Sequence, residues 1–67
     1  MKTYEHITNA RSSELALKFL RAHFANYRKM HGITKWSWRV KPETQKYEGK
    51  SKILAGKWRA YGRISFE

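Results

Sequence analysis

Hydrophobic and polar residues alternate along two segments of the chain. Between residues 57 and 66, every second position is apolar or small, from Trp58 to Phe66, and the positions between are mostly basic or polar. Residues 33–41 repeat the pattern, with Trp36 and Trp38 on one parity. Successive side chains of a β-strand point to opposite faces of its sheet. The alternation therefore predicts two strands, each with an aromatic inner face and a cationic outer face.

A helical period replaces this alternation between residues 12 and 31. Apolar residues recur there at spacings of three and four: Ala16, Leu17, Leu20, Phe24, Tyr27 and Met30. At 3.6 residues per turn these positions share one stripe, which predicts an amphipathic helix. The side chains that could cap its first turn are Thr8, Asn9, Ser12 and Ser13. Gly32 follows the last turn and predicts its end, because glycine readily adopts the left-handed conformation.

The remaining segments carry weaker signals. Residues 1–7 alternate enough to predict a short first strand. Pro42 is expected to end the strand of residues 33–41, and residues 42–52 read as a loop, with a short strand around Lys46 and Tyr47 as an alternative. Residues 52–54 are candidates for a fourth strand, followed by a turn or bulge at residues 55–56.

These elements assemble most simply into a single α+β domain covering residues 1–67. One amphipathic helix packs on a small antiparallel sheet of three strands, or four, to give two layers. The apolar stripe of the helix is expected to meet the inner face of the sheet, at Trp36, Trp38, Trp58, Ile64 and Phe66. The other face of the sheet is expected to look toward water.

Composition limits the partners and the compartment. The chain has 67 residues, with 15 Lys and Arg against five Glu, no Asp, no Cys and a net charge of +10. This excess favours nucleic acid, anionic membrane or an acidic protein as partner. No segment reads as a signal peptide or a membrane span, so we expect a cytoplasmic protein without membrane association. So short a chain buries a small core, which leaves self-association and the oligomeric state open.

The outward positions of the two predicted strands form the main candidate site. Seven residues lie on this parity: Lys35, Arg39, Lys41, Lys57, Arg59, Tyr61 and Arg63. Lys46, Lys50 and Lys52 in the predicted loop are expected to assist. The sequence carries no acid from 33 to 41 or from 49 to 65, whereas ordinary solvated faces mix both charges. We therefore predict binding to a phosphate backbone, DNA slightly before RNA, with a log–log salt slope near −5 for about six contacts.

The tryptophans share the inward parity, and Tyr61 is the one outward aromatic of the two strands. This distribution argues against a base-stacking platform and for contact with the sugar-phosphate backbone. The predicted architecture resembles that of DNA-binding domains that lay a three-stranded sheet in the major groove, an analogy of architecture alone. So small and basic a chain also suits an accessory protein of a bacteriophage or mobile element.

Other functions remain open at this point. The basic arc of the helix is a rival nucleic-acid surface, formed by Arg11, Lys18, Arg21, Arg28 and Lys29. An inhibitor or adaptor that docks on an acidic nuclease or polymerase would use the same cationic face. A metal-free, toxin-like ribonuclease using His6, Tyr61 and Arg63 is a third hypothesis. We expect no enzyme activity, no cofactor and no metal site, because the three His match no ligand spacing and no Cys or Asp joins them.

Overall fold

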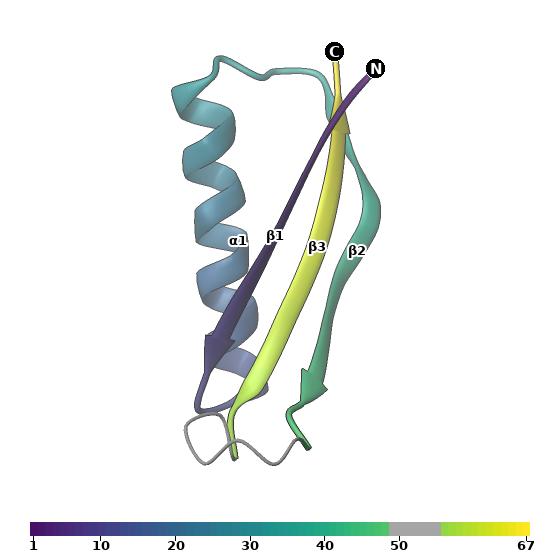
Figure 1. Ribbon diagram of the computed structural model, residues 1–67. Coiled ribbons are helices and arrows are strands. Elements are labelled where there is room, and N and C mark those ends of the chain that lie inside the picture. Colours follow the sequence, from purple (N-terminus) through teal and green to yellow (C-terminus); the bar gives the residue numbers. More distant parts are fainter. Residues whose placement is uncertain (49–55) are drawn as a thin grey trace.

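A computed structural model of the chain describes residues 1–48 and 56–67. Its elements follow the order β1 (Lys2–Ala10), α1 (Ser13–Met30), β2 (Trp36–Lys46) and β3 (Trp58–Phe66). The strands form one antiparallel sheet in the order β1-β3-β2, and α1 packs along one face of it (Figure 1). The predicted fold class, one helix against a three-stranded antiparallel sheet, is confirmed.

The helix begins and ends within one residue of the predicted bounds. Ser12 is its N-cap, and the Ser12 hydroxyl accepts a hydrogen bond of 3.2 Å from the Leu15 amide. This bond satisfies one of the free amides of the first turn. At the other end, Gly32 has a φ of 62° directly after the C-cap His31. Gly32 therefore has the conformational role that its position predicted.

Strand β1 is longer than the predicted segment of residues 1–7. It runs to Ala10 and pairs with β3 along its whole length, from Lys2 opposite Phe66 to Ala10 opposite Trp58. The Thr8 hydroxyl donates a 2.7 Å hydrogen bond to the carbonyl of Ala16 in α1. Thr8 is therefore a strand residue that ties β1 to the helix, and it does not cap α1.

The predicted end of the second strand at Pro42 is wrong. Strand β2 begins at Trp36, three residues later than predicted, and continues through Pro42 to Lys46. Its register against β3 shifts twice, between Trp38 and Val40 and between Val40 and Glu43. Because β2 is an edge strand with irregular pairing, the missing amide of proline costs no ladder hydrogen bond there. The candidate strand at residues 52–54 lies outside the described residues.

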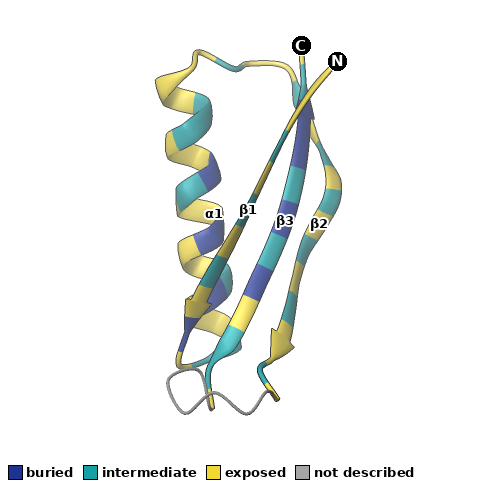
Figure 2. Ribbon diagram, in the orientation of Figure 1, coloured by how far each residue is buried: buried dark blue, intermediate teal, exposed yellow. Residues whose placement is uncertain are grey.

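The core lies between α1 and the middle of the sheet (Figure 2). Its fully buried large side chains are Leu20 and Phe24 from α1 and Ile64 from β3. The three tryptophans pack against this cluster and stay partly exposed. Met30, which was expected in the apolar stripe, is 81% exposed. At 100° per residue it lies about 80° around the helix from the buried row, so its side chain misses the sheet.

Gly62 lets the helix approach the central strand closely. A Cβ atom at this position would lie 3.3 Å from the Leu20 Cδ2 atom and 3.3 Å from the Trp38 Cζ3 atom. Gly62 therefore points toward the helix, and its neighbours Tyr61 and Arg63 point away from it. Within the described residues, no helix is both long and apolar enough to cross a membrane.

Candidate nucleic-acid interface

The face of the sheet opposite α1 is called the outer face here. It comprises the residues of β1 and β3 whose side chains point away from the helix and the exposed residues of β2 beside them, where two register shifts place Val40 opposite Arg63. They are Thr3, Glu5, Ile7 and Asn9 of β1, Ser37, Arg39, Lys41, Glu43 and Gln45 of β2, and Arg59, Tyr61, Arg63 and Ser65 of β3. All of these β1 and β2 residues are exposed. With no second layer over it among the described residues, this face is open to a large ligand.

Four of the predicted phosphate contacts lie on the outer face. Arg39 and Lys41 are exposed on β2 on either side of Val40, which pairs with Arg63, and Arg59 and Arg63 project from β3, the strand hydrogen-bonded to β2. Tyr61 lies between the two arginines of β3. These five side chains come from two segments far apart in the sequence that lie on paired strands. In β3 the predicted alternation holds, whereas in β2 two register shifts interrupt it around Arg39 and Lys41.

The other predicted contacts lie elsewhere. Lys35 precedes β2 at one end of the sheet, where Trp36 pairs with Phe66. Lys57 precedes β3 at the opposite end, next to Lys46, whose strand partner is Trp58. A nine-residue strand is about 30 Å long, so Lys35 and Lys57 lie far apart. Lys50 and Lys52 lie outside the described residues.

Glu5 of β1 organises one side of the outer face, and sequence reasoning missed it. Its Oε2 atom accepts hydrogen bonds from the Tyr61 hydroxyl at 2.6 Å and from the Arg63 Nη2 atom at 2.9 Å. The bond from Tyr61, followed by that from Arg63, holds the pKa of Glu5 below its usual range. The same two bonds raise the pKa of Tyr61 and that of Arg63. Arg63 is therefore partly neutralised before any ligand binds.

The expectation of an outer face without acids is wrong. Register places Glu5 opposite Arg63, and the extension of β2 beyond Pro42 adds Glu43 opposite Tyr61. Both acids lie outside residues 33–41 and 57–66, the two segments from which the outer face was predicted. The alternation of Thr3, Glu5 and Ile7 was the available signal, because it puts Glu5 on one parity of the first strand. The outer face thus carries four basic and two acidic side chains.

A hollow lies across the three strands of the outer face, beside Arg59. It has a volume of about 380 Å³ and is lined by Ile7, Glu43, Thr44, Gln45, Arg59 and Tyr61. Arg59 and Tyr61 give this hollow a hydrogen-bonding side next to the apolar Ile7. Its residues come from all three strands, so a ligand lying in it would contact the whole width of the sheet.

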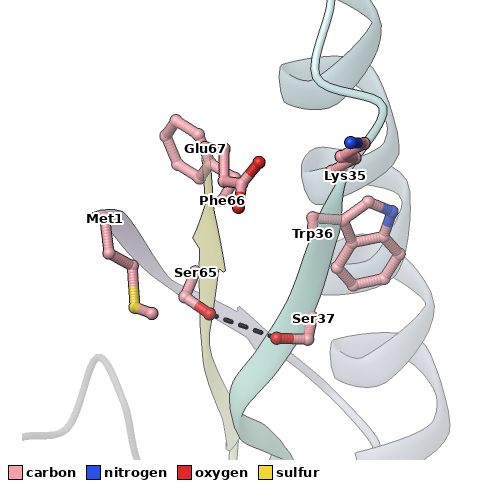
Figure 3. A pocket seen from close by; sticks show the side chains of 7 residues that line it. All are labelled: Met1, Lys35, Trp36, Ser37, Ser65, Phe66 and Glu67. Atoms are coloured by element: carbon pink, nitrogen blue, oxygen red, sulfur yellow. Dashed lines mark hydrogen bonds between the residues drawn. The ribbon is translucent and has the colours of Figure 1, made fainter.

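A second hollow of about 230 Å³ lies at the end of the sheet where β3 finishes (Figure 3). Lys35, Trp36 and Phe66 contribute to its lining, and the hydroxyls of Ser37 and Ser65 lie 3.2 Å apart beside it. Arg59 and Tyr61 line the other hollow and do not line this one. Lys35 is therefore associated with a separate end of the sheet.

The three residues of the ribonuclease hypothesis do not converge. His6 lies on the helix side of β1, where its ring stacks on that of His23 with centroids 3.4 Å apart. Tyr4 stacks on Tyr27 in the same layer, and the Tyr4 hydroxyl lies 2.6 Å from the His23 Nε2 atom. Burial, and then the neighbouring His23, lower the pKa of His6. Tyr61 and Arg63 are on the opposite face, so His6 cannot share a substrate with them.

The basic arc of the helix is placed on the far side of the molecule from the outer face. The side chain of Arg28 in this arc already makes contacts within the fold. Its guanidinium carbon lies 3.9 Å from the ring centroid of Trp36, and its Nε atom donates a hydrogen bond to the Phe24 carbonyl. Lys18, Arg21 and Lys29 are exposed. One straight duplex cannot contact both this arc and the outer face, since α1 and the sheet are successive layers.

No group of three or more His, Cys, Asp or Glu side chains within residues 1–48 and 56–67 is arranged to hold a metal ion. Comparison of the chain with known protein families, with curated proteins and with solved structures finds no significant match. Any functional assignment therefore has to come from the chemistry of the surface itself.

Proposed function

We propose that this protein binds nucleic acid without catalysis, by contacting the sugar-phosphate backbone of a duplex with its outer face, and that DNA is the preferred duplex. The observation that carries the proposal is the set of four cationic side chains on β2 and β3: Arg39, Lys41, Arg59 and Arg63. Each side chain held near a phosphate releases a condensed counterion, and that release drives binding.

Most of the positive charge is available to a ligand. Of the 15 Lys and Arg, two (Lys50 and Lys52) lie outside the described residues, which leaves 13. Among these 13, the ion pair between Arg63 and Glu5 is the one contact with a carboxylate within 4 Å. A small domain that needs charge only for solubility mixes both signs over its surface. The unpaired excess in this chain supports a polyanionic partner.

The dimensions of the cationic strand pair suit the major groove. Neighbouring strands lie about 4.8 Å apart and same-face residues about 6.8 Å apart along a strand. β2 and β3 form one side of a three-stranded sheet, with β1 on the other side of β3, so it is this side of the sheet that would enter the major groove of B-DNA, which is about 12 Å wide and admits two strands. The β1 side, which carries Glu5 and Ile7, is the less favourable side for phosphate. We therefore assign the closest approach to β2 and β3.

The small number of aromatic side chains on the outer face favours contact with the sugar-phosphate backbone over stacking on bases. Tyr61 is the one aromatic side chain on the outer face of the described strands, and it already donates a hydrogen bond to Glu5. Single-strand binders place several aromatic rings on an open sheet face. Binding is therefore expected to vary little with sequence and to weaken steeply with salt. Four phosphate contacts give a log–log slope of about −3.6 on B-DNA.

A fluorescence-anisotropy titration tests the proposal. The probes are a mixed-sequence DNA duplex, the corresponding single strand and an RNA duplex, each measured at several salt concentrations. The double variant Arg39→Ala/Arg59→Ala should weaken duplex binding and reduce the slope by about 2. The matched control is Arg21→Ala/Lys18→Ala, which removes the same charge from the basic arc of the helix and should leave the slope nearly unchanged.

Three results would overturn the proposal. Absence of duplex binding at low salt would reject nucleic acid as the partner, and retention of an acidic protein under the same conditions would favour the adaptor hypothesis. A larger loss in the control than in the outer-face variant would move the interface to α1. Tighter binding to single strands than to either duplex would reject the placement of β2 and β3 in a groove.

A further inference from the structure

The two edges of the sheet differ in how they are protected against pairing. Edge strand β2 contains Pro42, two register shifts and several charged residues, among them Arg39 and Lys41. Proline, bulges and inward or edge charges are the usual devices that block edge-to-edge association. Edge strand β1 contains neither proline nor a bulge. Its nine residues pair with β3 without a register shift, and only Lys2 and Glu5 are charged. Within residues 1–48 and 56–67, the edge of β1 is therefore the less protected one.

A second stripe of α1, apolar except for one asparagine, lies beside this less protected edge. It consists of Leu15, Phe19, Ala22, Asn26 and Met30, all of them exposed and spaced by three or four residues. We call this stripe the uncharged flank. Phe19 is 49% exposed and Met30 81% exposed, values that are unusual for large apolar side chains in so polar a chain.

Contacts on both sides of the helix fix where the uncharged flank points. His23 and Tyr27 stack on His6 and Tyr4 of β1. Phe19 precedes His23 by four residues and Met30 follows Tyr27 by three, so the flank follows the β1 side. On the other side, Arg28 stacks over Trp36 of β2, and Arg21 lies seven residues before it. The charged residues of α1 are thus gathered away from β1.

We propose that a second copy of this chain pairs with the first across β1, in antiparallel orientation, and that the two uncharged flanks pack together on the helix side. The two sheets then form one sheet of six strands with both helices on the same face. A register centred on His6 pairs all nine residues of β1 with those of the other copy. The same two-fold axis brings Phe19 of one copy near Asn26 of the other.

The charge distribution restricts self-association to this surface, and self-complementarity favours a second copy as the occupant. The chain carries a net charge of +10, so two copies repel each other wherever their Lys and Arg meet. The uncharged flank and the edge of β1 form the surface at which self-association brings few like charges together. An isologous contact also needs one patch that is complementary to itself, and an antiparallel edge strand has that property.

The sizes of the two surfaces agree with a stable dimer. The nine residues of β1 extend about 31 Å and the flank from Leu15 to Met30 about 22 Å. A standard interface buries about 800 Å² on each partner, roughly a seventh of the 5324 Å² exposed by one chain. α1 packs over the central strand β3, so with strands about 4.8 Å apart the two helix axes come about 14 Å apart across the two-fold axis, and the long side chains of Phe19 and Met30 fill the space between them.

Sedimentation velocity of the whole chain, without nucleic acid and with added salt to screen its charge, tests this proposal. The expected result is a concentration-dependent rise from 8.0 kDa to twice that mass. Asn26→Arg should raise the dimer dissociation constant at least about tenfold, because it places a charge without a partner against Phe19 of the other copy on each side of the axis. Ala25→Arg adds the same charge at an exposed position about 100° around α1 from Asn26, away from β1, and should change the constant by less than about twofold.

The Asn26→Arg variant tests only the contact between the helices. Amide hydrogen exchange therefore provides a second measurement, which tests the pairing of β1. The amides of β1 should exchange more slowly at chain concentrations that favour the dimer. A mass of 8.0 kDa at all concentrations would overturn the proposal. So would a dimer that Asn26→Arg and Ala25→Arg weaken equally, or exchange in β1 that is independent of concentration. None of these results depends on nucleic-acid binding, so the two proposals fail separately.

Discussion

The two faces of the sheet use the same strands for different purposes. On the inner face, residues such as Ile64 and Trp38 pack against Leu20 and Phe24, and the contacts are apolar and aromatic. On the outer face, residues of the same strands form exposed polar contacts, chiefly the bonds from Tyr61 and Arg63 to Glu5. Successive residues of β3 therefore alternate between stabilising the fold and meeting solvent.

This difference indicates which face can change its residues without loss of stability and can therefore acquire a binding function. Burial of apolar area supplies most of the stability of a small domain, so the inner face tolerates few changes. Exposed ion pairs contribute little to stability because water and salt screen them. Folding therefore does not require the charges of the outer face. Stability does not explain why this face has more cations than acids, whereas the proposed binding does.

The largest expected effect comes from emptying the inner face. Phe24→Ala removes a fully buried ring and should lower the free energy of unfolding by about 3–5 kcal/mol. Such a loss is comparable with the whole stability of a small domain, so most of the chain should unfold. Circular dichroism during urea unfolding measures the change.

The matched control is Phe19→Ala, which removes the same side chain from a half-exposed position of the same helix. Its loss should stay below about 1 kcal/mol when both variants are compared at low chain concentration. Equal losses for the two variants would show that α1 does not bury the face that contains Phe24.

A smaller effect is expected from overfilling the inner face. Gly62→Val adds a side chain where even a Cβ atom lies 3.3 Å from Leu20 and Trp38, and should cost about 1–3 kcal/mol. Arg59→Val puts the same residue on the exposed face of the same strand and should change stability by less than about 0.5 kcal/mol. Thermal unfolding of both variants checks this contrast, and a Gly62→Val variant as stable as the wild type would contradict it.

The stacked histidines of the inner face predict a dependence on pH. Burial, and then His23, lower the pKa of His6 in the folded chain, whereas the unfolded chain keeps the usual value of about 6.5. The unfolded state therefore binds more protons as the pH falls below about 6.5, and stability decreases there. Above that pH the contribution of His6 is fully present.

Unfolding temperatures measured across this range should fall toward acid for the wild type and fall less for His6→Phe, whose ring retains the stacking surface. Glu5 affects stability in a lower pH range than His6. Its pKa is lowered, so its contribution is present above about 4.3 and is lost as the pH falls through the lowered value. An unchanged slope near pH 6 in His6→Phe would remove His6 as the cause.

The smallest expected effect concerns Glu5 on the outer face. Glu5→Gln removes a charge that repels phosphate and releases Arg63 from its ion pair, so duplex affinity should rise roughly two- to fivefold. Stability should change little, because both partners are exposed. Glu48→Gln is the control, since Glu48 is an exposed acid outside the three strands. An increase of the same size in both variants would mean that only net charge matters.

Periodicity was sufficient to predict the helix and the division of the sheet into two faces. The stripe through Leu20 and Phe24 and the alternation around Trp58 are both local patterns, and each reports directly which side is buried. The same reasoning failed at Pro42, because whether a strand tolerates proline depends on its position in the sheet. That position became known only once β3 was found between β1 and β2.

The site was predicted in part for a related reason. Arg39, Arg59 and Arg63 follow from alternation within their own strands. Glu5 belongs to a different strand, and its contact with Arg63 depends on the pairing of residues 58 positions apart. The sequence contains both parities but does not show which strands are neighbours, so the contact between Glu5 and Arg63 could not be predicted.

The most direct test of the outer face as the binding surface is an NMR titration with a mixed-sequence DNA duplex that follows the side-chain Nε–H signals of the arginines. The account predicts large shifts for Arg39, Arg59 and Arg63 and little change for Arg21 on the helix. Shifts confined to Arg21 and its neighbours on α1, or none at any arginine despite saturating duplex, would contradict it.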